Sequence, residues 1–124
     1  NPGGSLVTLS FHGASKVMPN YNVMGVAKAA LETSVKYLSV DLGDQDVRVN
    51  AISAGPMRTL AGAAIANARD VFNYTSENSS LKRNVNLDEL GNSALYLVSD
   101  LSSAITGEIH YVDCGFNIVG MPKS

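Results

Sequence analysis

A long helical pattern flanked by two strand patterns constrains the fold of this chain more than any other feature. We expect a helix from Tyr21 to Leu42 that ends at Gly43, a residue type suited to a left-handed cap. Runs of β-branched and apolar residues at 5–11 and 47–53 predict a strand on each side of it. The helix face is defined by apolar and small residues at three-and-four spacing, which are Val23, Val26, Ala27, Ala30, Leu31, Ser34, Val35, Leu38 and Leu42.

The second half of the chain continues this alternation. Residues 57–86 begin Ala-rich and then become crowded with Asn, Ser and Thr, so we expect a mobile excursion with one or two short helices. A further helix should begin at Leu87 with Asn86 as its N-cap, and the run 108–113 predicts the last strand. The residues expected on the buried face of that helix are Ala94, Leu95, Leu97, Val98 and Leu101.

The expected order of elements is strand, helix, strand, excursion, helix, strand. This alternation indicates an α/β fold with right-handed crossovers and a parallel sheet that has helices on both faces. Three strands are too few to close such a layered domain. We therefore expect residues 1–124 to form half of an open α/β sheet, with no second domain.

Charge and composition exclude several classes of function. The 124 residues carry 9 Lys and Arg against 11 Asp and Glu, and this balance argues against a nucleic-acid or anionic-membrane binder. Charged residues make up only 16% of the chain, whereas about 25% is usual in soluble domains. We infer that partner subunits, or a missing piece of the same fold, cover part of the surface.

The cysteine and histidine content does not indicate a disulfide or a metal site. Cys114 is the single cysteine, and with His12 and His110 it has no metal-ligand spacing. No apolar run approaches the roughly 18 residues of a membrane helix, and no secretory leader opens the chain. We therefore expect no metal, no membrane partner and a cytoplasmic location.

Tyr21 and Lys28 are the first candidates for chemistry. Seven residues of helix turn through about 700°, so both side chains would leave one face about 10.5 Å apart along the axis. A phenol titrates near pH 10, and a nearby ammonium is a natural way to polarise it. Spacing alone, however, favours a pair without a catalytic role, because a tyrosine and a lysine often occur together on a partly exposed helix face.

The context of this pair resembles the active-site helix of the short-chain dehydrogenase/reductase superfamily. Most members have three residues between the tyrosine and the lysine, whereas six lie between Tyr21 and Lys28. Six is the spacing of the branch that contains bacterial enoyl-acyl-carrier-protein reductases. The resemblance covers essentially the whole chain, and the matching segments are 21–32, 48–56, 57–61, 95–100, 105–107 and 112–115.

The resemblance implies the C-terminal, catalytic half of a single Rossmann-like doubly wound domain. The implied activity is reduction of the trans-2 double bond of an enoyl-acyl-carrier-protein thioester by NADH, the last step of type II fatty-acid elongation. Tyr21 would donate a hydrogen bond to the enolate oxygen, and Lys28 would bind the nicotinamide ribose. Met57 would contact the carboxamide through its backbone, and Thr59 would contact the pyrophosphate. The residues implied in cofactor binding are Leu9, Ser10, Lys28, Met57, Arg58, Thr59, Leu60 and Ala61.

The implied substrate site includes a departure from many relatives. Phe11 stands where many of them carry a second tyrosine, so Tyr21 must act alone. Met24 and Ile65, taken as isolated residues, are more often core than ligand contacts. Residues 60–81 lie where the family has its substrate-binding loop, and their composition suits a segment that orders only with ligand. The residues implied in substrate binding are Phe11, Tyr21, Met24, Pro56 and Ile65.

The resemblance also implies what the chain lacks and what it assembles with. No glycine-rich phosphate loop occurs, so we expect the dinucleotide-binding half to be absent and the chain alone to be inactive. NADH rather than NADPH is a family expectation. The 21–42 helix resembles one that packs against its counterpart in a family homotetramer, and Ala29, Ala30, Thr33 and Ser34 would permit close approach.

Two other functions stay open at this point. One is a different short-chain reductase, such as one acting on a 3-ketoacyl thioester, although the spacing of Tyr21 and Lys28 argues against it. The other is a non-catalytic remnant that only assembles with a homologous subunit. The retained Tyr21 and Lys28 argue against this second alternative, and the missing cofactor half argues for it.

Overall fold

The computed structural model describes residues 3–57 and 68–121, and it has the expected alternation of strands and helices. The strands are β1 (Gly4–Phe11), β2 (Val47–Ala54) and β3 (Ile109–Val112). The α-helices are α1 (Val23–Gly43), α3 (Ala68–Asn78) and α4 (Leu87–Val98). The described residues also include three short 3-10 helices, which are η1 (His12–Ala14), η2 (Asp100–Ser102) and, after the last strand, η3 (Phe116–Ile118).

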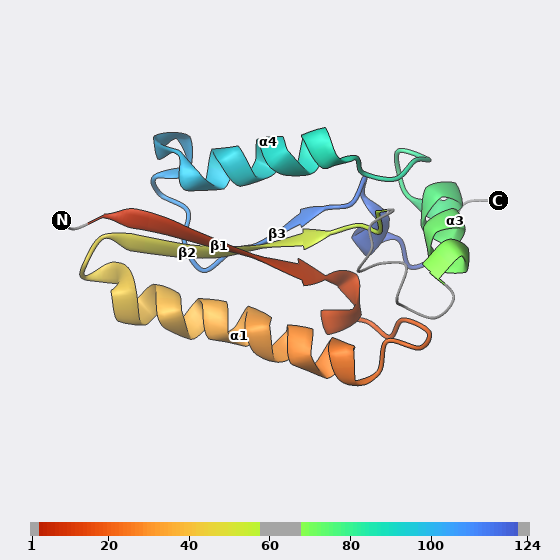
Figure 1. The fold of residues 1–124 in the computed structure, drawn as a ribbon, viewed down its shortest axis with the longest axis horizontal. Helices are drawn as coiled ribbons and strands as arrows, with labels where there is room; N and C mark the ends of the chain where they lie inside the picture. Colours follow the sequence, from red (N-terminus) through yellow and green to blue (C-terminus); the bar gives the residue numbers. More distant parts are fainter. Residues whose placement is uncertain (1–2, 58–67, 122–124) are drawn as a thin grey trace.

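The three strands form one parallel sheet in the order β1-β2-β3. The pairing of β1 with β2 runs from Gly4 opposite Val47 to Phe11 opposite Ala54. Helix α1 covers one face of the sheet and α4 covers the other, as Figure 1 shows. The predicted α/β fold with a parallel sheet is therefore confirmed.

The central strand β2 holds the two halves of the core together. Successive side chains of a strand point to opposite faces. Val49 and Ala51 accordingly pack with Val35 of α1, whereas Ile52 packs with Leu97 of α4. Ile52 and Leu97 are fully buried, as expected for a parallel sheet that is covered on both faces.

Helix α1 differs from the prediction at both ends. It begins at Val23, because Asn22 has a positive φ of 42° that interrupts the helix after Tyr21. The predicted left-handed cap at Gly43 is wrong, since Gly43 is the last helical residue and Asp46 takes the positive φ of 56°. The apolar stripe is also wider than its contact with the sheet, and Val26 is 72% exposed.

Helix α4 has the predicted N-terminus but only part of the predicted buried face. The Asn86 side chain accepts from the Glu89 N–H, and the Glu89 carboxylate accepts from the Asn86 N–H, which makes a complete capping box. Leu97 is buried as predicted. The prediction is wrong for three apolar residues that are exposed, which are Leu95 and Val98 of α4 and Leu101 of η2.

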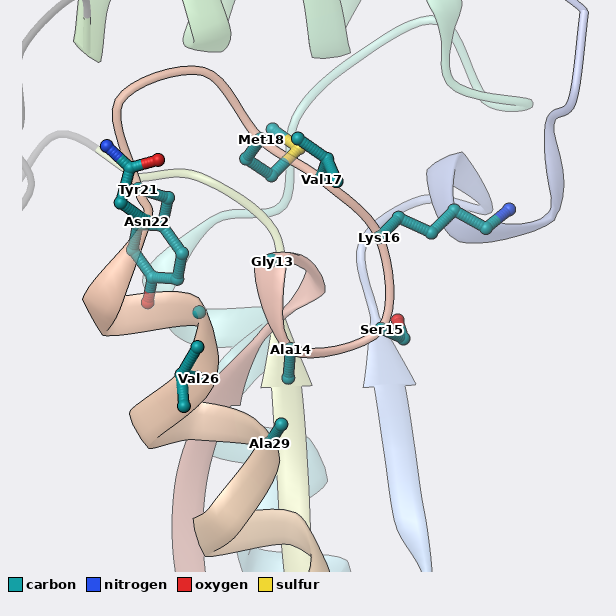
Figure 2. Close-up of a pocket in the computed structure, with 11 residues that line it drawn as sticks. Gly13, Ala14, Ser15, Lys16, Val17, Met18, Tyr21, Asn22, Val26 and Ala29 are labelled. Carbon is teal, nitrogen blue, oxygen red and sulfur yellow. The ribbon is translucent and has the colours of Figure 1, made fainter.

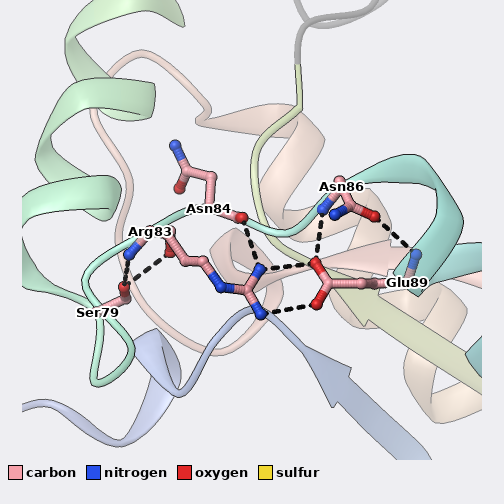
Figure 3. A network of polar contacts seen from close by, with 5 residues as sticks. All are labelled: Ser79, Arg83, Asn84, Asn86 and Glu89. Carbon is pink, nitrogen blue, oxygen red and sulfur yellow. Dashed lines mark hydrogen bonds and ion pairs between the residues drawn. The ribbon is translucent and has the colours of Figure 1, made fainter.

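Polar contacts tie the end of α3 to the start of α4, as Figure 3 shows. The buried Ser79 hydroxyl donates to the Arg83 carbonyl and accepts from the Arg83 N–H. The Arg83 guanidinium pairs with both oxygens of the Glu89 carboxylate at 2.7 Å. Hydrogen bonds from Arg83 and from the Asn86 N–H lower the pKa of Glu89 to about 2. Within the predicted excursion, α3 is thus a helix that is fixed at its C-terminal end.

Arg48 of β2 links the sheet to the C-terminal end of α4. Its guanidinium donates five hydrogen bonds of 2.8–3.1 Å. The acceptors are the Leu97, Ser99, Ser102 and Ile105 carbonyls and the Ser102 hydroxyl. Because partly buried carbonyls would lose a charged donor, this side chain should matter for stability.

We expect Arg48→Met to lower the free energy of unfolding by about 1–3 kcal/mol, because four partly buried carbonyls lose a charged donor, although each keeps another hydrogen bond. Chemical denaturation of the complete natural polypeptide that contains residues 1–124 would measure this change. Arg69→Met, at an exposed position of α3, is the matched control and should change the value by less than about 0.5 kcal/mol. Equal effects of the two substitutions would contradict this role of Arg48.

Candidate active site

The structure brings the described candidates for the site together at the carboxyl end of the sheet. Leu9, Ser10 and Phe11 end β1, and Pro56 and Met57 follow β2. Tyr21, Met24 and Lys28 lie before or within the first turns of α1, which begins at this same end (Figure 1). Open α/β sheets bind ligands beyond the carboxyl ends of their strands. The remaining candidates lie outside the described residues, and these are Arg58, Thr59, Leu60, Ala61 and Ile65.

The Tyr21 side chain is only 7% exposed, and its ring packs edge-on against Phe11 with centroids 5.1 Å apart. Tyr21 stands in a turn just before α1, and its N–H donates to the Met18 carbonyl. Tyr21 therefore does not share a helix face with Lys28, and the predicted geometry of the pair is wrong. Burial raises the pKa of Tyr21 above its ordinary value of 10, so the phenol remains protonated and can donate.

Two glycines that the sequence analysis did not single out make room for the Tyr21 ring. A Cβ on Gly13 would lie 2.3 Å from Cδ2 and 2.7 Å from Cε2 of that ring. A Cβ on Gly25 would lie 2.8 Å from the Gly13 carbonyl oxygen. Both positions therefore need glycine because of close packing rather than an unusual φ.

Lys28 reaches from α1 to the end of β1. Its ammonium donates a 3.0 Å hydrogen bond to the Leu9 carbonyl oxygen. Leu9 is two residues before Phe11, the residue that packs on Tyr21. The ammonium of Lys28 and the ring of Tyr21 thus both contact the last three residues of β1.

A second contact joins the same two elements. The Ser10 hydroxyl donates to Oε2 of Glu32 at 2.5 Å. Ser10 is 5% exposed, whereas Glu32 is partly buried on α1. Glu32 was not among the residues predicted for the site. Its position four residues after Lys28 was the available signal, because residues at that spacing share a helix face.

The candidate substrate contacts are accessible to different degrees. Phe11 and Pro56 are partly buried. Met24 is 51% exposed, so it is not a core residue in this structure. The Met57 side chain packs against the core beneath α4, which leaves its backbone as the part available for a ligand.

His12 directly follows Phe11 as the first residue of η1, and it has an unusual environment. Its ring is 8% exposed and packs edge-on against Phe116, and its Nδ1 has no hydrogen-bond partner among the described residues. Burial lowers the pKa of His12 below 6.5, against the opposing attraction of Asp113. The buried Asp113 carboxylate is itself engaged by the Gly115 N–H and by the backbone and side-chain amides of Asn117.

An open pocket of about 370 Å³ lies between the 13–18 loop and the first turns of α1, as Figure 2 shows. Tyr21 lines this pocket, together with Gly13, Gly25 and Val26. Phe11, Met24, Lys28 and Pro56 do not belong to its lining. The pocket therefore shares only Tyr21 with the candidate active site, and we do not assign the substrate to it.

Residues 3–57 and 68–121 contain no group of His, Cys, Asp or Glu that could hold a metal ion. Among the same residues, no helix has the length and apolar character needed to cross a membrane.

We expect Gly13→Ala to lower the free energy of unfolding by about 1–3 kcal/mol, because the added methyl overlaps the Tyr21 ring. Denaturant titration of the complete natural polypeptide would measure the loss. Gly91→Ala is the matched control, since Gly91 lies in α4 with nothing within 4 Å of the added Cβ. That change should stabilise by up to about 1 kcal/mol. Tyr21→Ala should abolish the cost of Gly13→Ala, and a cost that persisted there would contradict the overlap.

The lowered pKa of His12 predicts a loss of stability in acid. Because the unfolded chain binds the proton more readily, the free energy of unfolding should fall as the pH drops below about 6.5. Lys16, Glu32 and Asp113 are the other charged groups that influence His12. His12→Leu should flatten this part of the pH profile, as measured by thermal melts between about pH 7 and pH 5. An unchanged profile in the variant would show that His12 is not the responsible group.

Comparison with known proteins identifies the family of this chain. The family model described as "Enoyl-(Acyl carrier protein) reductase" matches residues 1–117. The enoyl-[acyl-carrier-protein] reductase [NADH] 1 of Rhizobium meliloti (strain 1021) is 61% identical over 98% of the chain and 44% of that protein. The corresponding protein of Synechocystis sp. is 56% identical over 96% of the chain and 46% of its own length.

Solved structures of the same family have nearly the same fold. FabI from Candidatus Liberibacter asiaticus superposes with a TM-score of 0.95 at 60% identity, covering 98% of this chain and 47% of that one. The reductase of Anaplasma phagocytophilum, solved in complex with NAD, gives 0.93 at 58% identity, with coverage of 99% and 47%. The chain thus spans less than half the length of these relatives. It belongs to the enoyl-(acyl carrier protein) reductase family.

Proposed function

We propose that the complete natural polypeptide containing this chain reduces the trans-2 double bond of an enoyl thioester on acyl carrier protein with NADH. The observation that carries this proposal is the convergence of Tyr21 and Lys28 on the last residues of β1. The names of the relatives, which are NADH enoyl reductases at 56–61% identity, support it. Residues 1–124 would be the C-terminal, catalytic half of a single domain.

Tyr21 supplies the hydrogen-bond donor of the proposed reaction. Reduction at the β-carbon leaves negative charge on the thioester oxygen, and a donor held at that position stabilises the charge as it develops. The buried phenol keeps its proton, because its pKa is raised. Phe11 packs on the ring but has no hydroxyl, so Tyr21 is the single phenol of this ring pair.

Lys28 has the donors that a nicotinamide ribose requires. An ammonium carries three N–H donors, and the Leu9 carbonyl occupies one of them in this structure. The other two can donate to two ribose hydroxyls. The Leu9–Ser10 strand end and the backbone of Met57 lie at the same edge of the sheet, so the described residues fit a nicotinamide there. When bound, NADH supplies the hydride that the protein itself cannot provide.

The remaining roles complete the proposal. Arg58, Thr59, Leu60 and Ala61 would extend the cofactor site, and Thr59 would contact the pyrophosphate. Phe11, Met24, Pro56 and Ile65 would contact the acyl thioester. The reaction would be the last step of type II fatty-acid elongation, carried out in the cytoplasm by a homotetramer.

NADH oxidation with two substrates tests this function in the complete natural polypeptide. We expect turnover of crotonyl thioester and much slower turnover of acetoacetyl thioester. Tyr21→Phe should lower kcat by about 10²–10³-fold, the usual effect of removing one oxyanion donor. Tyr37→Phe removes an exposed hydroxyl from α1 and is the matched control.

Three outcomes would contradict the proposal. Faster turnover of acetoacetyl thioester would indicate a 3-ketoacyl reductase. An unchanged kcat in Tyr21→Phe would show that the Tyr21 hydroxyl plays no part in the reaction. No NADH oxidation with either thioester by a folded complete polypeptide would favour a non-catalytic protein that only assembles with a homologous subunit.

A further inference from the structure

The hydrogen bond between Ser10 and Glu32 lies at the end of β1, where it can affect the positions of the active-site residues. Ser10 is buried, and its hydroxyl donates to Oε2 of Glu32. A hydroxyl carries one proton, so Ser10 can offer only lone pairs to any other group while this bond is present. Loss of the acceptor would leave a buried hydroxyl without its partner, which is unfavourable.

Among the described residues, this bond and the one from Lys28 are the side-chain hydrogen bonds that join the end of β1 to α1. Lys28 donates to the Leu9 carbonyl, and Glu32 accepts from the hydroxyl of the next residue in the strand. Lys28 and Glu32 are four residues apart in α1, so they stand one turn apart on the same face. The two contacts together fix both the position and the rotation of the strand end.

The fastened segment leads directly to the ring that positions the phenol. Phe11 follows Ser10, and its ring packs at 5.1 Å on Tyr21. A shift of Ser10 would therefore move the support of Tyr21 and the carbonyl that Lys28 contacts. Displacements of about 1 Å in a catalytic group can cost about a hundredfold in rate.

We propose that Glu32 is a positioning residue for the reductase reaction, which it serves by holding Ser10 and thereby aligning Tyr21 and Lys28 at the end of β1. This inference rests on the proposed function. Glu32 contacts neither substrate nor cofactor in this role, because it acts through the Ser10 hydroxyl. Its contribution is therefore to the alignment of groups that carry the chemistry.

Variants of Glu32 and Ser10 in the complete natural polypeptide test the proposal. Glu32→Ala and Ser10→Ala should each lower kcat by about tenfold with less than about twofold change in KM for crotonyl thioester, because alignment affects the transition state more than binding. The double variant should be no slower than either single one, since the two residues act as a unit. Glu32→Gln keeps an oxygen acceptor and should restore most of the rate.

Asp41→Ala is the matched control, because Asp41 is an exposed carboxylate on the same helix. It should leave kcat unchanged. A normal kcat in Glu32→Ala, with only a lower melting temperature, would overturn the proposal by showing a purely structural role. Equal damage from Glu32→Gln and Glu32→Ala would also overturn it, since charge rather than hydrogen-bond acceptance would then matter.

Amide hydrogen exchange separates this proposal from the proposed function. Glu32→Ala should accelerate exchange at residues 9–11 while the β3 amides keep their protection. Uniform acceleration across the sheet, or no change at 9–11, would contradict the positioning role. This measurement needs no turnover. Absence of activity in the unmodified polypeptide would refute the proposed function, whereas the exchange rates would still decide whether Glu32 holds the end of β1.

Discussion

The parallel pairing of β1 with β2 is the constraint on which the rest of the structure depends. Eight consecutive residue pairs, ending at Phe11 opposite Ala54, bring the two strands to a common carboxyl edge. Since β2 is buried on both faces, its side chains also set where α1 and α4 pack. The candidate site is assembled at this edge from the last residues of β1, the turn before α1, the first turns of α1, and Pro56 and Met57 after β2.

The site depends on close packing as much as on its polar groups. The Tyr21 ring fits between Phe11 and Gly13, and the glycine is required because a single methyl there would overlap the ring. The same burial that holds the ring also keeps the phenol protonated. Packing and chemistry are thus linked at one residue, whereas Lys28 is placed by a polar contact to the backbone of β1.

Local patterns were enough to predict the order of elements and several of their ends. The N-cap at Asn86 could be predicted because its chemistry is local, and the structure adds the reciprocal bond from Glu89. The apolar spacing that predicted α1 could not show that Asn22 interrupts the helix after Tyr21, since that depends on a backbone φ. The same spacing overestimated the buried face of α4, because it does not tell how wide a contact the sheet provides. Gly13, His12 and Glu32 were missed because their importance comes from tertiary contacts.

The most direct test of the central claim is a crystal structure of the complete natural polypeptide with NAD⁺. We expect the nicotinamide ribose within hydrogen-bond distance of the Lys28 ammonium, beyond the carboxyl end of β1. We also expect the Tyr21 hydroxyl to face the space beside the nicotinamide, with the ring still packed on Phe11. A nicotinamide bound away from Lys28, or a Tyr21 hydroxyl turned away from it, would contradict the proposed site.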